Sequence, residues 1–462
     1  MAALRLDRIA AATGGNFLQG SGEAVAAGFV VDSRLVRPGD LFFAVVADRD
    51  GHDYAADAAA RGAVGAVVSR PVAGLPAGFA LIRTPDTVQA LQALARSVLA
   101  ERPVKVVAVT GSVGKTTTKE FTAAILARRF DVLKSGGNFN NHLGLALSIL
   151  GLQPHHTAAV LEMGMRAAGE IRILASIAPP DVAVITNVNP AHLEFLGSLE
   201  RIAAAKWELV EGLKSGGAAV INGDDPQLRR RAAARNGRTI LFGRGGNVEV
   251  GAEDVVRRGF DGYGFRLRLG TRTVPCRLGF LTDGYLSNAL AASAAAHALG
   301  VPPEEIAAAV VGLHPAPGRG GWIRLAGGGI LVDDSYNSNP AALAAALQGL
   351  AGLPAARRVA ILGDMLELGP GEDGFHEEAG RIAAAAGWDV LITIGPRSRH
   401  LAEAAVAGGM DPAAVRNVET SDLAAEALAG ILRPGDLVLV KGSRGMRTET
   451  AAARVKDLFK EA

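Results

Sequence analysis

An apolar run, a glycine-rich turn and a helix that opens on Lys-Thr-Thr follow one another directly over residues 104–130. The run VKVVAVT is typical of a buried strand, and KTTTKEFTAAILARRF is predicted to be a helix. A strand that enters a helix through glycines places backbone N–H groups at the helix N-terminus, where they can bind phosphate. This segment therefore predicts an α/β fold with a phosphate site at one edge of its sheet.

The turn and the start of this helix form a candidate nucleotide site. Its predicted members are Thr110, Gly111, Ser112, Val113, Gly114, Lys115, Thr116 and Thr117. Lys115 can reach the β- and γ-phosphates of a nucleotide, and the Thr116 hydroxyl can bind Mg²⁺. The spacing departs from G-x-x-x-x-G-K-[ST], because Val109 stands where the first glycine would be. A purely structural glycine turn is the alternative for this segment.

Strand and helix signals alternate along the whole chain and divide it into units. A length of 462 residues leaves room for about three domains of roughly 150 residues each. We expect a small α/β domain over 1–102, a central parallel-sheet domain over 103–313, and a doubly wound, Rossmann-like domain over 314–462. Residues 247–280 alternate polar and apolar side chains and are predicted to form a β-hairpin insertion.

Polar residues follow two further strands of the predicted central sheet. Glu162 ends one strand, and Asn187 and His192 follow another. The carboxyl ends of parallel strands share one edge, so these side chains are expected at the nucleotide crevice, where Glu162 could hold Mg²⁺. The alternatives are a helix cap for Glu162, a structural role for His192 and a solvated helix position for Lys206.

Two further polar clusters are candidates for ligand contacts. Asn138–Asn141 precede an apolar helix and either form a turn or bind an amide-rich ligand. In the third unit Asp333–Asn337 end a strand, and their adjacent acids suit ribose hydroxyls or a cation. Arg319 is a candidate phosphate contact. Because polar groups end several strands, we expect the active site in the crevice between the domains.

Composition excludes several classes of protein. Lys and Arg number 48 against 46 Asp and Glu, so bulk charge argues against a nucleic-acid partner. Cys276 is the single cysteine, which rules out an intrachain disulfide and fits a reducing compartment. Charged residues interrupt the N-terminal apolar segment and no run of 18 apolar residues occurs. We therefore expect no signal peptide, no membrane span and a cytoplasmic location.

Nine segments together resemble the Mur ligase family of peptidoglycan synthesis, over essentially the whole chain. They are VDSRLVRPGDLFFAVVADRDGHDYAADAAARGAVGAVVS, TGSVGKTTTKE, GNFNNHLGLALSIL, LEMGMRAAGEI, TNVNPAHLEFLGSLERIAAAKWEL, INGDD, DDSYNSNP, LGDMLELG and LVLVKGSRGMRTE. DDSYNSNP with LGDMLELG is the most specific pair and is similar to the MurF branch. The DNPR-type motif expected of the MurE branch is absent from the sequence.

The resemblance implies an ATP-dependent amide ligase that uses Mg²⁺. Such an enzyme joins D-alanyl-D-alanine to UDP-N-acetylmuramoyl-tripeptide through an acyl phosphate and releases ADP and phosphate. It implies a UDP-binding first domain, an ATP-binding central domain and a Rossmann-like third domain. A monomer is expected.

Roles at individual positions are likewise implied by the resemblance. Thr116 and Glu162 resemble the ligands of one Mg²⁺, and His192 resembles a ligand of a second. Lys206 aligns with a lysine that is carbamylated in many Mur ligases, and a carbamate could also bind Mg²⁺. Lys115, Glu162, His192 and Lys206 are thus the predicted catalytic residues. Further ATP contacts are predicted at Asn288, Arg319 and Asp334, and substrate contacts at Ser33, Arg34, Asp50, Gly51, His52, Asn140, Asn141, Tyr336 and Asn337.

Three alternatives stay open at this point. The first is another amide ligase, of the MurE type or a folylpolyglutamate synthase. The second is a P-loop kinase or ATPase, which would turn over ATP without an amine acceptor. The third is a non-catalytic nucleotide-binding scaffold, which would be expected to lose Lys115, Glu162 or His192, and all three are present.

Overall fold

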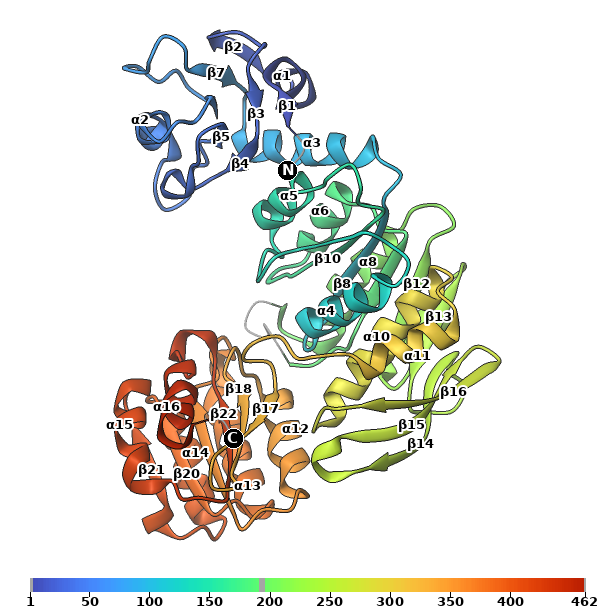
Figure 1. The fold of residues 1–462 in the computed structure, drawn as a ribbon, viewed down its shortest axis with the longest axis vertical. Coiled ribbons are helices and arrows are strands. Elements are labelled where there is room, and N and C mark those ends of the chain that lie inside the picture. The colour runs from blue at the N-terminus through green and yellow to red at the C-terminus, as the bar shows by residue number, and fades with distance from the viewer. Residues whose placement is uncertain (1–2, 191–195, 461–462) are drawn as a thin grey trace.

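The computed structural model describes residues 3–190 and 196–460. Three α/β units follow one another, with the N-terminal and C-terminal units at opposite ends of the long axis (Figure 1). This arrangement confirms the predicted three-part α/β fold. The exact domain boundaries at residues 102 and 313 stay predictions.

The N-terminal unit is a mixed sheet with helices on it. Its main sheet has the order β2 (Asn16–Gln19), β7 (Ala80–Arg83), β6 (Gly65–Val68), β5 (Asp40–Phe43) and β4 (Gly28–Val30). β2 is antiparallel to β7, and the other neighbours are parallel. The remaining elements are β1 (Leu4–Arg5), paired with β3 (Val25–Ala26), and the helices α1 (Leu6–Thr13), α2 (Ala55–Ala60) and α3 (Thr87–Ala100). Two short 3₁₀ helices, at Ser33–Leu35 and Gly51–Tyr54, carry the predicted UDP-site residues.

The central unit is built on a long, mainly parallel sheet. Its order is β16 (Arg272–Leu278), β15 (Tyr263–Leu269), β14 (Val250–Arg257), β13 (Thr239–Gly243), β12 (Ala218–Asn222), β11 (Val182–Ile185), β8 (Lys105–Thr110), β10 (Ala158–Glu162) and β9 (Val132–Lys134). β14 pairs in parallel with β13 and is followed by two antiparallel neighbours. The antiparallel pairs β14–β15 and β15–β16 confirm the predicted β-hairpin structure over 247–280, but these strands are not a separate insertion, because β14 continues the central sheet beside β13. Local alternation could not reveal their pairing to β13.

Helices cover both faces of the central sheet. They are α4 (Lys115–Leu126), α5 (His142–Leu150), α6 (Glu170–Ile177), α8 (Leu199–Glu211), α9 (Pro226–Ala233), α10 (Asp283–Ala298) and α11 (Pro303–Val311). On one face, α4 and the alanine-rich α10 pack together over Val107 and Val109. Each such valine, fully buried, contributes about 1.5–3 kcal/mol. On the other face α5 packs against α3, so one apolar core joins the N-terminal and central units.

The C-terminal unit is a doubly wound sheet, as the sequence predicts. Its order is β17 (Gly321–Arg324), β18 (Ile330–Asp334), β22 (Asp436–Lys441), β19 (Arg357–Gly363), β20 (Val390–Ile394) and β21 (Val415–Val418). The helices are α12 (Pro340–Ala351), α13 (Glu372–Ala385), α14 (Ser398–Ala407), α15 (Ser421–Ile431) and α16 (Glu449–Phe459). The predicted helix start at Asn339-Pro340 is confirmed, since the Asn339 side chain accepts a hydrogen bond from the Ala342 N–H at 2.9 Å.

Two absences among the described residues bear on the sequence-based expectations. None of the helices between residues 3 and 460 that the structure places is long and apolar enough to cross a membrane. Cys276 is buried as a free thiol, and burial raises its pKa to about 12.

Candidate active site

Three parallel strands bring the predicted central residues to one edge of the sheet. Glu162, at the end of β10, is in register with Val109 of β8, and Ile185 of β11 is in register with Thr110. The glycine-rich turn after β8 therefore lies between the ends of its two neighbours. This is the shared edge that the sequence predicts.

Two glycines of the turn have no room for a side chain. At Gly111 (φ +152°) a Cβ would lie 1.8 Å from Oγ1 of Thr186, and at Gly114 (φ +83°) it would lie 2.2 Å from Oδ1 of Asn288. Both backbone conformations also disfavour other residues. The turn is thus fitted closely between β11 and α10.

Asn187 fixes the turn from the neighbouring strand. Its carbonyl oxygen accepts from the Ser112 N–H at 3.1 Å, and its Oδ1 accepts from the Val113 N–H at 2.9 Å. Its side-chain amide donates to the Val113 carbonyl at 3.0 Å. These two N–H groups of the loop are therefore occupied within the protein. The groups best placed for phosphate are the N–H groups of the first turn of α4, which starts at Lys115 and has no earlier carbonyls to bond.

Lys115, Thr116 and Arg319 lie together at the start of α4. The Lys115 ammonium donates to the Gly111 carbonyl at 2.9 Å. Burial lowers the pKa of Lys115, Glu162 opposes this shift and Arg319 adds to it. Nη2 of Arg319 donates to Oγ1 of Thr116 at 3.2 Å. A residue from the segment that leads into the C-terminal unit thus contacts the predicted phosphate loop directly.

One carboxylate oxygen of Glu162 accepts a hydrogen bond, and the other has no partner among the described residues. Oε1 accepts from Nδ2 of Asn140 at 2.9 Å, whereas Oε2 is buried with no hydrogen-bond partner. The residue is 3% exposed, so the alternative of a surface helix cap is wrong. A buried carboxylate oxygen that lacks a partner, within electrostatic reach of Lys115 and at the same sheet edge as the turn before Thr116, is an oxygen donor that suits Mg²⁺.

His192 lies outside the described residues, so its predicted metal role has no geometry here. Within the ranges 3–190 and 196–460, no three His, Cys, Asp or Glu side chains gather as a metal site. Any Mg²⁺ at Thr116 and Glu162 would therefore need oxygens from the nucleotide or water to complete its ligands.

Lys206 lies buried in α8 and is 2% exposed, so the solvated-lysine alternative is wrong. Burial lowers its pKa well below the usual value, and Lys115 lowers it further. No hydrogen bond or ion pair joins its ammonium to another described residue. Its environment favours the neutral amine, which is the nucleophilic form of a lysine.

The predicted C-terminal contacts are mostly paired with one another. The Asp334 carboxylate accepts a hydrogen bond from Nζ of Lys441 at 2.7 Å, and its charge raises the pKa of the Tyr285 hydroxyl. Lys441 also donates to the Asn337 carbonyl at 2.9 Å. Tyr336 lies against Arg319. Asn288 accepts from the Thr118 hydroxyl at 3.3 Å, beneath the glycine turn. Ligand contacts of these residues stay predictions.

The predicted UDP-site residues lie apart, in the N-terminal unit (Figure 1). Ser33 is buried, and Arg34 pairs with Asp32 at 2.7 Å. The backbone and ring N–H groups of His52, together with Arg70, hold the pKa of the Asp50 carboxyl well below its usual range. His52 itself is 2% exposed, and its Nε2 accepts from the Ser69 N–H at 2.9 Å.

This geometry gives His52 a structural role, whereas the side chain of Arg34 is exposed and that of Asp50 is half-buried between His52 and Arg70. Gly51, between Asp50 and His52, starts a 3₁₀ helix and has no space for a Cβ, because one would lie 2.5 Å from the Val45 carbonyl. In the central unit, Asn141 caps α5 by accepting from the Gly144 N–H at 2.8 Å. Direct substrate contacts at these positions stay predictions.

Sequence reasoning missed the buried Lys119 and the partly buried Tyr285, which support the site. Lys119 is 0% exposed and donates to the Ser135 carbonyl at 2.8 Å, which anchors the loop that leads to Asn140. Tyr285 lies within electrostatic reach of Asp334 of the C-terminal unit, and burial, followed by the charge of Asp334, raises its pKa. Spacing was the available signal, since Lys119 lies one helical turn beyond Lys115, and Tyr285 lies three residues before Asn288.

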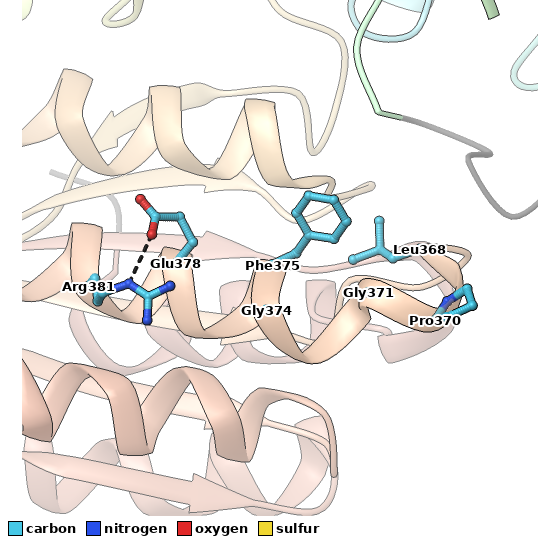
Figure 2. Close-up of a pocket in the computed structure, with 7 residues that line it drawn as sticks. All are labelled: Leu368, Pro370, Gly371, Gly374, Phe375, Glu378 and Arg381. Atoms are coloured by element: carbon cyan, nitrogen blue, oxygen red, sulfur yellow. Dashed lines mark hydrogen bonds and ion pairs between the residues drawn. The ribbon is translucent and has the colours of Figure 1, made fainter. Parts of the chain in front are cut away.

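A separate hollow lies on the C-terminal unit. It has a volume of about 530 Å³ and is lined by Leu368, Pro370, Gly371, Gly374, Phe375, Glu378 and Arg381. Figure 2 shows Phe375 on α13 and Leu368 just before it, with the ion pair between Glu378 and Arg381 at 2.9 Å. None of the predicted site residues lines it, so the hollow is distinct from the strand-edge cluster.

Comparison with known proteins identifies the family. The profile of the Mur ligase middle domain matches residues 109–296, and that of the Mur ligase glutamate ligase domain matches residues 318–444. The UDP-N-acetylmuramoyl-tripeptide–D-alanyl-D-alanine ligase of Bacillus subtilis is 36% identical over 441 residues, which span 95% of this chain and 94% of that protein. The chain belongs to the Mur ligase family, in its MurF branch.

Solved MurF structures share this architecture. MurF from Acinetobacter baumannii superposes with a TM-score of 0.90 at 30% identity, covering 99% of both chains. MurF from Thermotoga maritima, in complex with ADP, superposes with a TM-score of 0.83 at 32% identity, covering 93% of this chain and 97% of that one. The three-unit arrangement of this Mur ligase is therefore that of the branch.

Proposed function

We propose that this chain joins D-alanyl-D-alanine to UDP-N-acetylmuramoyl-tripeptide, with ATP converted to ADP and phosphate. The chemistry is supported by the position of four residues near one edge of the central sheet, namely Lys115, Thr116, Glu162 and Arg319. The substrates come from the B. subtilis relative, whose name specifies the tripeptide and the dipeptide and of which this chain covers 94%. The ADP bound to the T. maritima relative supports ATP as the nucleotide.

The reaction has two chemical steps. An oxygen of the tripeptide's terminal carboxylate attacks the γ-phosphorus, the bond to the β,γ-bridging oxygen breaks, and ADP leaves. The amine of the dipeptide then attacks the acyl carbon, and the tetrahedral intermediate expels phosphate as the nitrogen loses a proton. Lys115 and Arg319 offer two cations where a carboxylate meets a triphosphate, which offsets their mutual repulsion.

Thr116 and Glu162 would hold Mg²⁺, which would supply further charge neutralisation at the phosphates. Lys206 is the proposed site of carbamylation. Its buried amine can add to CO₂ in the neutral form that burial favours, and loss of a proton yields an anion. That anion would stand near the Lys115 ammonium, where the opposite charges would attract each other.

The acyl phosphate would hydrolyse if water reached it, so the C-terminal unit has to cover the cluster during turnover. Arg319 can link the position of the C-terminal unit to the phosphate loop, because it belongs to the segment between the units and contacts Thr116. We place the enzyme in the cytoplasm, where nucleotide-linked precursors and ATP are available, and we propose that it acts as a monomer without nucleic-acid or membrane partners.

A matrix of substrates tests the function. Phosphate release from ATP and Mg²⁺ is measured with UDP-muramyl dipeptide or tripeptide, and with a diamino acid or D-alanyl-D-alanine as acceptor. Release that needs both the tripeptide and D-alanyl-D-alanine is the expected result. Release with the dipeptide substrate and a diamino acid would indicate MurE chemistry. Release with ATP alone would indicate a simple ATPase, and no release in any combination would indicate a scaffold.

A further inference from the structure

The ring of Tyr336 lies against the guanidinium of Arg319. Cζ of Arg319 is 3.9 Å from the ring centroid, within the range of a strong cation–π contact, and Cζ of Arg444 is 5.4 Å from the same centroid. The Tyr336 N–H also donates to the Gly318 carbonyl at 3.0 Å, next to Arg319 in the chain. Ring and backbone of Tyr336 therefore both hold the segment that carries Arg319.

Arg319 connects this ring to the phosphate loop. Its Nη2 donates to Oγ1 of Thr116 at 3.2 Å, while its guanidinium face rests on Tyr336. Among the described residues no carboxylate forms an ion pair with Arg319. The ring of Tyr336 is therefore the main contact that the C-terminal unit makes with its guanidinium. Fixing an arginine side chain costs about 2 kcal/mol of rotamer entropy. A ring that already holds the side chain in place lowers the part of this cost that falls on ligand binding.

We propose that Tyr336 is a positioning residue that holds Arg319 where it meets the terminal phosphate of the nucleotide. The proposal rests on the proposed function and assigns Tyr336 a task other than substrate contact. Mg²⁺ at Thr116 would use the same hydroxyl oxygen that Arg319 contacts, so Arg319 has to turn to a phosphate oxygen when the metal–nucleotide complex binds. The ring keeps the guanidinium within reach during that exchange.

Tyr336 contacts Arg319 through the face of its ring. Its hydroxyl takes part in no hydrogen bond with a described residue, so phenylalanine can replace it for this purpose. A residue without a ring cannot, because the quadrupole that attracts the cation is then lost. ADP lacks the terminal phosphate, so the ring should affect the binding of AMP-PNP and not that of ADP.

The test is calorimetric binding of ADP and of AMP-PNP, each with Mg²⁺, to the full chain. Tyr336→Leu is expected to weaken AMP-PNP binding by about 2- to 30-fold, the range of cation–π contacts, and to change ADP binding by less than about 2-fold. Tyr336→Phe is expected to bind both nucleotides like the parent. Trp322→Leu is the matched control, because it removes another arginine–ring contact of the same unit. Cζ of Arg324 lies 5.6 Å from the centroid of the Trp322 ring, and the loss of this contact should leave both affinities unchanged.

A double-mutant cycle with Arg319→Ala separates positioning from general damage. In the Arg319→Ala background, Tyr336→Leu should cause no further loss of AMP-PNP affinity. An equal loss in both backgrounds, an equal loss for ADP, or a Tyr336→Phe variant as weak as Tyr336→Leu would overturn the proposal. If Tyr336→Leu does not fold, Tyr336→Met keeps the bulk without the ring and carries the same expectation. Because binding is measured without an acceptor, failure of the ligase assignment would not alter this result.

Discussion

Replacing Asn140 by alanine should weaken the binding of Mg²⁺ without disturbing the rest of the site. The Asn140 amide holds Oε1 of Glu162 at 2.9 Å, which leaves the buried Oε2 as the free metal donor. Without the amide the carboxylate can rotate, because Oε1, a charged acceptor, no longer receives the hydrogen bond from Asn140. Loss of a partner that orients a metal-binding carboxylate costs about 10- to 100-fold in metal affinity or activity. We expect an increase of that size in the Mg²⁺ concentration that gives half-maximal phosphate release.

The assay titrates Mg²⁺ at fixed, saturating substrates and is repeated as Mn²⁺ binding to the protein with AMP-PNP, read by electron paramagnetic resonance. Asn141→Ala is the matched control, because Asn141 is the adjacent residue and its side chain caps α5 and does not bond Glu162. That variant should lose about 1 kcal/mol of stability and keep its metal dependence. An unchanged metal affinity in Asn140→Ala, or an equal change in Asn141→Ala, would refute the role of Asn140.

Three residues carry the remaining predictions. Lys115→Ala should abolish phosphate release but retain binding of the UDP-substrate, measured by calorimetry, and retained turnover would remove Lys115 from the phosphate site. Lys206→Ala should be inactive and partly rescued by bicarbonate or a short carboxylate, whereas full activity without rescue would exclude a catalytic carbamate. Between the lowered pKa of Lys206 and its usual value of 10.5 the unfolded chain binds more protons, so native stability rises with pH there. Lys206→Met should flatten that rise in urea unfolding followed in CO₂-free buffer, and an unchanged slope would contradict the buried neutral amine. Gly111→Ala should lose nucleotide binding because its Cβ would lie 1.8 Å from Oγ1 of Thr186, and normal binding would show that the loop tolerates a shift.

The parts of the site that follow from local sequence were predictable. A buried run before a glycine turn fixes a strand that ends at Thr110, and the parallel pairing of β8, β10 and β11 then places Glu162 at the same edge. The helix start at Asn339-Pro340 was likewise predictable from capping chemistry alone. The strand, the glycine turn and the helix start each depend on residues within a few positions of one another, and the shared edge follows because parallel strands end on the same side of a sheet.

The parts that depend on distant pairs were not predictable. The bond from Asn140 to Glu162 joins residues 22 positions apart, and the contact of Arg319 with Thr116 spans 203 positions. The burial of His52 depends on Ser69, and the burial of Lys206 depends on how α8 packs on the sheet. No local pattern encodes such contacts, so the sequence alone does not show that Asn140 bonds Glu162, and it leaves a solvated position open for Lys206.

In the proposed reaction this cluster activates a carboxylate by phosphorylating it. The most direct test uses UDP-N-acetylmuramoyl-tripeptide labelled with ¹⁸O in its terminal carboxylate, with ATP, Mg²⁺ and D-alanyl-D-alanine. Mass spectrometry of the released phosphate should find one labelled oxygen for each amide bond formed, because the attacking carboxylate oxygen leaves with phosphorus. Unlabelled phosphate released alongside the ligated product would contradict an acyl-phosphate intermediate.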